Sequence, residues 1–399
     1  MSKFMTQDKL RRELFSIAPM VDVTDKWYRY FMRLLSKHSV LYSEMINENA
    51  VLHHANKPNN PILSYTKNQH PVVFQLGGNN PAKMAEAAKI LEEWGYDEVN
   101  INCGCPSKAT KDGKFGAILM FEPQLVASIC SEMRKAVKIP VTVKCRLGVD
   151  NRDSYPEMVQ FVKTVSEEGG ITKFIIHARK AFLSGLNPKE NRTIPPLKYE
   201  WVFRLKSEFP HLNFVINGGF DKVEKVKDIL SETQPLKDVC DGLGLEGCMS
   251  GRMAMNNPWE IARIDREIYG DESCQTGTRE EIIREYARFA QEEQDSADFN
   301  LSTNMLVKPL INLFAGEYDG GKFRGFLTKE AAKKENAKKV EKVILEALEY
   351  YRGLHPEALE TRNGIKVVKP SWKIADEEKA RLEYQMKKLD LEQKSAEVK

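Results

Sequence analysis

Short apolar runs alternate with longer stretches of helical periodicity over residues 15–252. The runs are rich in β-branched residues and cover 15–20, 40–45, 72–76, 99–103, 141–146, 174–177, 214–217 and 247–251. Helical patterns fill the intervals, for example 81–94, 123–137, 154–168 and 199–209. This alternation indicates a parallel sheet of the α/β class, and eight repeats predict a (β/α)8 TIM barrel. An open doubly wound sheet is the alternative. No G-x-G-x-x-G motif follows the first run, which disfavours its dinucleotide-binding form.

The chain changes character after the barrel. We expect a helix over 259–269 and a linker over 270–277, and helical periodicity then continues over 279–352. Beyond residue 353 the chain is charged and poor in large apolar residues, apart from Leu382, Met386 and Leu389 at helical spacing. The sequence therefore predicts a TIM-barrel catalytic domain at 1–270, a small all-α helical domain at 278–352, and a charged, partly disordered tail at 353–399.

Polar or small residues suited to chemistry stand at the end of every predicted strand. In order, these ends carry Ala18, Pro19 and Met20; Ser43 and Glu44; Gln75; Asn102 and Cys105; Lys144 and Arg146; His177 and Arg179; Asn217, Gly218 and Gly219; and Gly251 and Arg252. In TIM barrels the carboxyl ends of the strands carry the active site, and the loops after strands seven and eight bind phosphate. Glycine amides and a guanidinium at those two ends would suit a phosphate group. Each residue alone has an ordinary structural explanation, but their shared placement is harder to explain by packing.

The fourth strand end is the most unusual. Val99 and Ile101 alternate with Asn100 and Asn102, and a thiol, Cys105, then lies in a Gly/Pro turn. A thiol placed there can face a ligand. The alternative is that it packs as a small apolar residue, as most free cysteines do.

Composition narrows the class of protein. The chain is 42% hydrophobic and 29% charged, and no apolar run approaches the roughly 18 residues of a membrane span. The first twelve residues lack the apolar core of a signal peptide, so we expect a cytoplasmic protein, with an organelle as the alternative. The seven cysteines are scattered, and Cys103 and Cys105 are the only close pair, so neither a disulfide framework nor a metal site is expected.

The net charge of +3 is unevenly distributed. Residues 271–298 hold nine acidic and three basic residues, whereas 322–342 hold eight basic and three acidic ones. A basic surface of this kind attracts polyanions such as nucleic acids. A solvated helix surface is the alternative explanation.

Taken together, the motifs resemble those of the flavin-dependent tRNA-dihydrouridine synthases, most closely the A-type subfamily that acts on the D-loop at positions 20/20a. The similarity extends from residue 15 to about 340. It rests on the strand ends given above, on the stretches 102–107 and 176–181, and on residues 188–197, which resemble the subfamily's own signature.

The resemblance implies an FMN-containing barrel, a helical tRNA-binding domain, and reduction of a uridine C5–C6 double bond with NADPH as the reductant. The residues that match flavin-binding positions are Ala18, Pro19, Met20, Gln75, Lys144, His177, Asn217, Gly218, Gly219, Gly251 and Arg252. Cys105, and not Cys103, matches the proton donor to C5 after hydride transfer from flavin N5 to C6, and Asn102 matches a residue that holds the target base. The residues expected to contact tRNA are Lys189, Glu190, Arg192 and Arg324, with Lys322 where Gly321 replaces a second arginine of the subfamily.

The residue chemistry agrees with this resemblance. Hydride addition at C6 leaves negative charge toward C5 and O4, so a nearby acid must protonate C5, and a neutral thiol can do so. Lys144, Arg179 and His177 could stabilise that charge. The alternatives are an FMN-dependent barrel oxidoreductase acting on a free pyrimidine or small enone, and a catalytically silent RNA-binding protein. The enzyme is expected to act on tRNA as a monomer.

Overall fold

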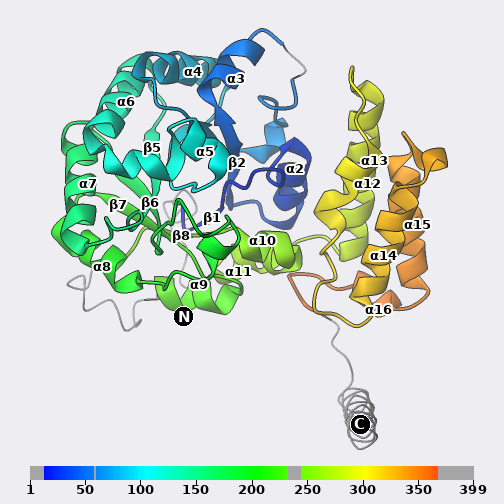
Figure 1. Ribbon diagram of the computed structural model, residues 1–399. Helices are drawn as coiled ribbons and strands as arrows, with labels where there is room; N and C mark the ends of the chain where they lie inside the picture. The colour runs from blue at the N-terminus through cyan, green and yellow to red at the C-terminus, as the bar shows by residue number, and fades with distance from the viewer. Residues whose placement is uncertain (1–12, 58–59, 232–243, 367–399) are drawn as a thin grey trace, which may run out of the picture.

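The computed structural model describes residues 13–57, 60–231 and 244–366. Within them, eight parallel strands form a closed barrel in sequence order, with β1 pairing both β2 and β8 (Figure 1). The strands are β1 Phe15–Ile17, β2 Val40–Asn47, β3 Val72–Gly77, β4 Glu98–Cys103, β5 Val141–Arg146, β6 Lys173–His177, β7 Asn213–Asn217 and β8 Gly247–Ser250. The predicted (β/α)8 barrel of the α/β class is therefore confirmed, and helices follow it.

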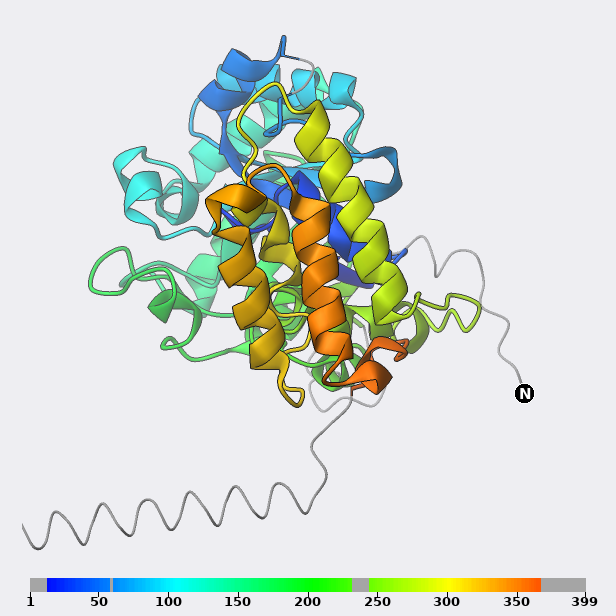
Figure 2. The same cartoon turned by 90° about the vertical axis from the view of Figure 1, so that its right-hand side faces the viewer.

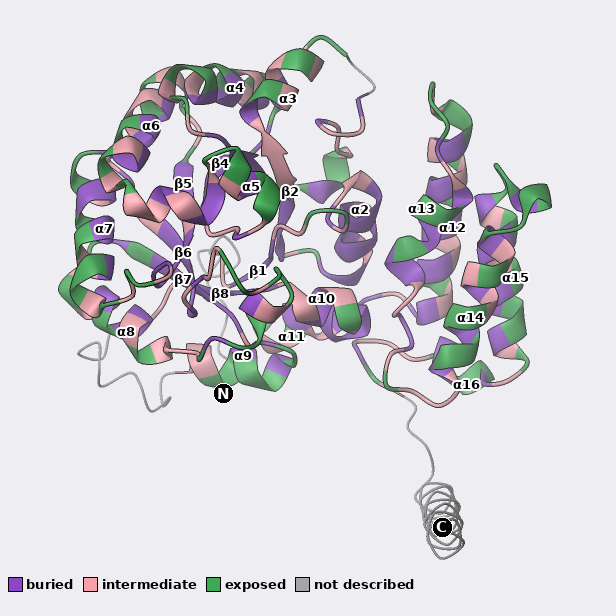
Figure 3. Ribbon diagram, viewed as in Figure 1, coloured by how far each residue is buried: buried purple, intermediate pink, exposed green. Residues whose placement is uncertain are grey.

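Helices surround the barrel and bury their inner faces against it (Figures 1 and 3). They are α2 Lys26–Leu35, α3 Glu48–His54, α4 Pro81–Trp94, α5 Lys108–Asp112, α6 Pro123–Ala136, α7 Tyr155–Glu167, α8 Tyr199–Glu208, α9 Val223–Leu230 and α10 Arg252–Asn256. Their ends follow from local sequence. The side chain of Asn80 caps α4, Pro81 occupies its first turn, and Gly95 ends it at a φ of 91°.

The alternation of side chains along the strands creates two different environments. Outward residues such as Val99, Ile101 and Cys103 pack beneath the helices. Inside the barrel, an apolar cluster comprises Ala18, Val40, Tyr42, Val73, Ile175, Val215 and Met249. A polar row crosses β3, β4 and β5 on the same interior, where Gln75, Asn100 and Thr142 are paired directly across neighbouring strands. The barrel interior thus combines an apolar cluster with a polar row.

The helix predicted over 259–269 is only partly correct. A 3₁₀ helix, η5 (Pro258–Arg263), occupies its first half, and the α-helical turn α11 (Ile264–Glu267) follows. Five consecutive residues, 258–262, are buried in η5. Packing on all sides of this short segment favours the tighter helix over the amphipathic α-helix that the pattern suggested.

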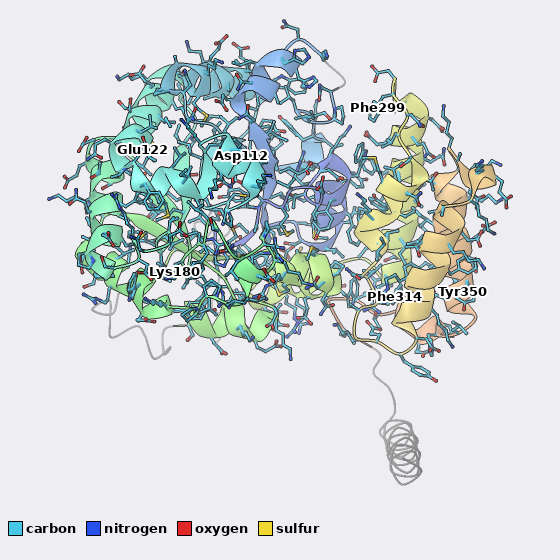
Figure 4. The ribbon with its side chains drawn as sticks, viewed as in Figure 1. Asp112, Glu122, Lys180, Phe299, Phe314 and Tyr350 are labelled. Atoms are coloured by element: carbon cyan, nitrogen blue, oxygen red, sulfur yellow. The ribbon has the colours of Figure 1, made fainter. Side chains whose placement is uncertain are left out.

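The chain beyond η5 and α11 forms an all-α part. Its helices are α12 Arg279–Ser296, α13 Thr303–Val307, α14 Gly320–Ala331, α15 Val340–Arg352 and α16 Pro356–Leu359. Figure 2 shows α12, α14 and α15 lying side by side. Phe314, labelled in Figure 4, packs against Phe323 and Tyr351 in the core of this part.

The all-α part is attached to the barrel by close contacts between α2 and α12. The rings of Tyr30 and Phe289 stack with centroids 3.6 Å apart, and Glu293 accepts hydrogen bonds from Lys26 at 2.7 Å and Trp27 at 3.1 Å. The helical part therefore has a defined position beside the barrel (Figure 1).

Residues 354–366 differ from the predicted tail because they are folded. Ala358 and Leu359 of α16 are buried, and Trp259 donates a hydrogen bond to the carbonyl of Ile365 at 2.6 Å. Few apolar residues suffice here because they fill the space between the barrel and the helical part. The rest of the predicted tail, 367–399, and the segment 232–243 lie outside the described residues.

Candidate active site

A cavity of about 510 Å³ opens at the carboxyl end of the barrel. Its size is within the usual range for sites that bind small molecules or cofactors. The structure brings to its lining fifteen of the residues singled out from the sequence, namely Ala18, Pro19, Met20, Gln75, Asn102, Cys105, Lys144, Arg146, His177, Arg192, Asn217, Gly218, Gly219, Gly251 and Arg252. Residues from all parts of the barrel sequence therefore converge on one space.

The loop that carries Cys105 is held in place by hydrogen bonds at both ends. The side-chain oxygen of Asn102 accepts from the backbone N–H groups of Gly104 at 3.0 Å and Cys105 at 2.9 Å. The carbonyl of Cys105 accepts from the N–H of Ala117 at 2.8 Å and from the hydroxyl of Thr110 at 3.0 Å. These bonds leave the Cys105 side chain half-buried at the cavity wall.

Cys103 faces the opposite way. It is fully buried in the core between the barrel and its helices, close to Cys130 and Cys145. Burial and these two neighbours raise the pKa of its thiol well above the usual value. β4 ends at Cys103, so the turn through Gly104 takes Cys105 out of the strand, and only the sulfur of Cys105 reaches the cavity.

Lys144 spans the mouth of the barrel from β5 to β7. Its ammonium group donates a hydrogen bond to the side-chain oxygen of Asn217 at 3.2 Å, and the amide nitrogen of Asn217 donates to the carbonyl of Met249 at 2.8 Å. Burial, followed by repulsion from Arg146, lowers the pKa of Lys144 to about 8, although Cys105 opposes this shift. Lys144 is therefore a cation that is close to releasing its proton.

His177 is neutral. Burial, followed by the surrounding cations Arg146, Lys144, Arg179 and Arg252, lowers its pKa well below the usual value. Its ring lies against the backbone of the β7 loop, since a Cβ atom at Gly218 would stand 2.8 Å from the ring carbon Cδ2. In this neutral ring, one nitrogen donates a hydrogen bond and the other accepts one.

The loops after β7 and β8 have the properties of an anion site. Gly218 and Gly219 adopt φ angles of 116° and 84°, which favour glycine, and a Cβ atom at Gly219 would meet the Tyr199 hydroxyl oxygen at 2.5 Å. Within the described part of the chain, the N–H of Gly219 and the guanidinium of Arg252 donate to no protein acceptor. Donors without a protein acceptor, next to glycine backbone that carries no side chains, fit a phosphate group.

The charge of the cavity supports the same assignment. Among the described residues, its lining includes the four cations Lys144, Arg146, Arg192 and Arg252, and no aspartate or glutamate. Apolar groups such as Met20, Met45 and Phe115 complete the wall. A flat apolar ring system that carries a phosphate, as FMN does, fits this donor set.

Two arginines that the sequence placed at strand ends act on the neighbouring loop. Arg146 donates to the carbonyls of Gly104 at 3.2 Å and Asn191 at 2.8 Å, so it connects the Cys105 loop to residues 188–197. Arg179 donates to the carbonyls of Thr193 and Pro195 and lies outside the cavity lining. The expectation that Arg179 stabilises substrate charge is therefore wrong, because its donors are directed at this loop.

Asn191 was missed by the sequence analysis. It is fully buried and donates to the carbonyls of Phe182 at 3.0 Å and Leu186 at 3.1 Å, while its side-chain oxygen accepts from the N–H of Phe182. These bonds hold residues 182–191 in a compact loop. Its position within the signature segment 188–197 was the available signal.

The residues expected to contact tRNA lie in two places, the 188–197 loop beside this cavity and helix α14. Lys189 and Arg192 are exposed on the 188–197 loop, while Glu190 accepts from the N–H of Asn187 at 2.8 Å. On α14, Lys322 pairs with Asp319 at 3.0 Å, and Arg324 lines a smaller cavity of about 320 Å³. That smaller cavity also includes Asn256, at the end of α10, so it adjoins the barrel.

A group of potential metal ligands lies elsewhere in the described structure. His38, Asp265 and Cys274 place one ligand atom each within 4.8 Å of one another. Asp265 already accepts hydrogen bonds from Ser36, Lys37, His38 and Cys274, which indicates a structural role. None of the described helices has the length and apolar character needed to cross a membrane.

Comparison with known proteins was made against family models and curated sequences. The model described as Dihydrouridine synthase (Dus) matches residues 16–349. A "tRNA-dihydrouridine(20/20a) synthase" of Synechocystis sp. is 44% identical over 302 residues, which cover 76% of this chain and 84% of the relative. Proteins with the same name from Escherichia coli strain K12 and Vibrio vulnificus are each 42% identical, over 80% of this chain and 87% and 91% of the relatives.

Proposed function

The chain belongs to the dihydrouridine synthase family, oxidoreductases that reduce uridine in tRNA, and on that premise we propose that its cavity holds FMN beside the target base, with Cys105 as the proton donor. The observation that carries this proposal is the cavity itself: a thiol and a cluster of unpaired donors share one space with four cations and, among the described residues, no acidic group. The names of the relatives extend the proposal to D-loop uridines at positions 20 and 20a.

FMN would be held at its phosphate by the Gly219 N–H and the Arg252 guanidinium, next to Gly218 and Gly251. Lys144, with its ammonium group fixed by Asn217, and the neutral His177 would contact the polar edge of the ring system and its side chain. Ala18, Pro19, Met20 and Gln75 line the part of the cavity left for the ring, and these side chains exclude water from it.

The chemistry requires one hydride and one proton. FMN reduced by NADPH would supply the hydride to C6 of the uracil. Cys105 would donate its thiol proton to C5, since its loop is fixed by Asn102 and its sulfur faces the cavity. Lys144, which raises the local positive potential, would stabilise the negative charge that develops on the uracil carbonyl.

The target base is stacked inside folded tRNA, so it must leave the stack to enter the cavity, at a cost of a few kcal/mol. Backbone contacts would offset this cost. We assign these contacts to Lys189, Glu190 and Arg192 beside the cavity and to Lys322 and Arg324 on α14, so that residues 278–352 form the tRNA-binding domain. The enzyme would act as a monomer.

The test uses tRNA transcribed in vitro, which lacks modified bases. Purified protein supplied with FMN and NADPH should convert uridine to dihydrouridine in the D-loop, as detected by mass spectrometry of tRNA fragments. Free uridine and a small enone serve as competing substrates in parallel reactions. Turnover of a free pyrimidine or enone without reduction of tRNA would contradict the proposal and favour a small-molecule oxidoreductase.

A further inference from the structure

A continuous hydrogen-bond chain runs down the inside of the barrel from the Cys105 loop. The side-chain oxygen of Asn102 accepts from the N–H of Cys105, and the amide nitrogen of Asn102 donates to the side-chain oxygen of Gln75 at 2.8 Å. The amide nitrogen of Gln75 then donates to the side-chain oxygen of Asn100 at 2.8 Å. All three amide side chains are buried, and Asn100 lies below the cavity rather than in its lining.

The chain continues to the amino end of the barrel, opposite the cavity. The amide nitrogen of Asn100 donates to the hydroxyl oxygen of Thr142 at 2.9 Å, and that hydroxyl donates to the carboxylate of Glu98 at 2.6 Å. Glu98 is the first residue of β4 and is 7% exposed. It is paired with Lys173 at 2.6 Å, and Lys173 also pairs with Glu13.

The two ends of this chain dictate the same direction for every link. A carboxylate can only accept hydrogen bonds, so the Thr142 hydroxyl must donate to Glu98 and accept from Asn100. At the other end, a backbone N–H can only donate, so Asn102 must present its oxygen to Cys105. Each amide between these ends is left with one orientation. Its oxygen points along the chain toward Cys105, and its nitrogen points along the chain toward Glu98.

We propose that Glu98 is a positioning residue for the reaction, because it fixes the direction of the hydrogen-bond chain and hence the amide orientation of Gln75 and Asn102. This inference rests on the proposed function of the cavity. An amide carries two N–H donors, and the chain uses one from each of these side chains. The remaining N–H of each residue is available to the cavity, whereas both side-chain oxygens are already engaged. The floor of the cavity therefore offers donors to a ligand and selects carbonyl oxygens or ring nitrogens.

The buried Glu98 carboxyl group lies against the ammonium group of Lys173, at 2.6 Å. Burial raises the pKa of its carboxyl group, and the adjacent Lys173 opposes that shift. The groups that face this carboxylate are Lys173, Glu13, Thr142 and the Tyr42 hydroxyl, which donates at 3.4 Å. The charge at the start of the chain polarises each following hydrogen bond in the same sense.

The test compares Thr142→Val, which removes the hydroxyl link but preserves shape, with Thr142→Ser, which keeps the link. The first readout is amide hydrogen–deuterium exchange of the peptide that contains Gly104 and Cys105, measured on purified protein without tRNA. The second is the dissociation constant of FMN from fluorescence quenching. We expect Thr142→Val to raise the exchange rate and the dissociation constant of FMN by about tenfold each, the lower end of the effect of outer-shell partners at metal sites. Thr142→Ser should keep both at wild-type values.

A peptide from α7 serves as the control for general loss of stability, because that helix lies outside the barrel. Equal exchange and equal FMN affinity in Thr142→Val and Thr142→Ser would overturn the proposal. If Thr142→Val fails to fold, Glu98→Leu takes its place, because leucine offers no acceptor to the Thr142 hydroxyl, and wild-type values for that variant would overturn the proposal equally. The exchange measurement at Gly104 and Cys105 does not depend on tRNA reduction. If the wild type fails to reduce tRNA but Thr142→Val and Thr142→Ser differ in exchange, the proposed function is refuted and the positioning role of Glu98 in the loop is not.

Discussion

The phosphate assignment predicts that Arg252→Gln weakens FMN binding much more than riboflavin binding. Riboflavin differs from FMN only in lacking the phosphate, so the ratio of the two affinities isolates the phosphate contact. The guanidinium of Arg252 lines the cavity, and the carboxylate that it attracts, Asp221, is already paired with Lys225 at 2.8 Å. Its removal therefore leaves no carboxylate unpaired in the described structure, and the folded protein should lose little stability.

The magnitude follows from the contact. A hydrogen bond to a charged group contributes about 1.5–3 kcal/mol net, and Arg252 is only partly buried, so we take about 1.5–2 kcal/mol. This corresponds to about 10- to 30-fold in the dissociation constant of FMN. The dissociation constant of riboflavin should change by less than about twofold, because the ring contacts remain.

The assay is quenching of flavin fluorescence during titration with protein, for FMN and riboflavin in parallel. Arg324→Gln is the matched control, since Arg324 is also a cation but lies on α14 outside the cavity. It should leave both affinities unchanged. An FMN-to-riboflavin ratio in Arg252→Gln that equals the wild-type ratio would refute the phosphate assignment, and a drop in both affinities would place Arg252 at the ring instead.

Three further variants test other parts of the structure. Cys105→Ala should lower the single-turnover rate of uridine reduction by about 10²–10⁴-fold with flavin still bound. Cys103→Ala should leave that rate nearly unchanged, because its sulfur faces the core. Equal losses in the two variants would mean that the proton donor is not Cys105. The kcat/KM should fall as pH rises through about 8, where Lys144 loses its proton, and Lys144→Arg should move this fall to higher pH; an identical pH profile in both proteins would exclude Lys144 as its source. Arg279→Met should reduce the free energy of unfolding in urea by about 3–5 kcal/mol, since it leaves the buried Glu317 carboxylate without this ion pair, and a change below about 1 kcal/mol would contradict that role.

The sequence predicted the barrel well because each strand coincides with a short apolar run. Apolar runs such as 72–76 and 141–146 lie within one residue of β3 and coincide with β5. Glycine and proline mark the loops between them. The segment 259–269 and residues 354–366 were predicted less well, because their structure depends on contacts with distant parts of the chain, such as the hydrogen bond between Trp259 and Ile365.

The cavity could be predicted residue by residue, but its supporting bonds could not. Parallel strands in a barrel all end at one face, so a list of polar strand ends is already a list of neighbours. The direction of each side chain beyond the strand is a different matter. Arg146 and Arg179 both follow strands and carry the same charge, yet Arg146 reaches the cavity and Arg179 binds the carbonyls of the loop. No local pattern distinguishes the two.

The position of Glu98 could have been predicted in part from the sequence. A glutamate that begins a strand is usually exposed, so it carried no functional expectation. The two-residue period nevertheless places it on the same inward face as Asn100 and Asn102, both of which were noted. Its partner Thr142 becomes visible only with the register of β4 and β5, which pairs Asn100 with Thr142. Strand register is set by the whole barrel, and therefore this link required the structure.

The cavity departs from the usual balance of charge, and this departure ties the fold to the function. Lys144 and Arg146 repel each other, and together with Arg252 they help to hold His177 in its neutral form. Such an arrangement disfavours folding unless an anion is bound, and violations of this kind are expected at functional sites. A bound phosphate would offset the repulsion and stabilise the native state in proportion to its affinity. If the proposed function holds, these cations would favour the binding of FMN and then of the phosphate backbone of tRNA.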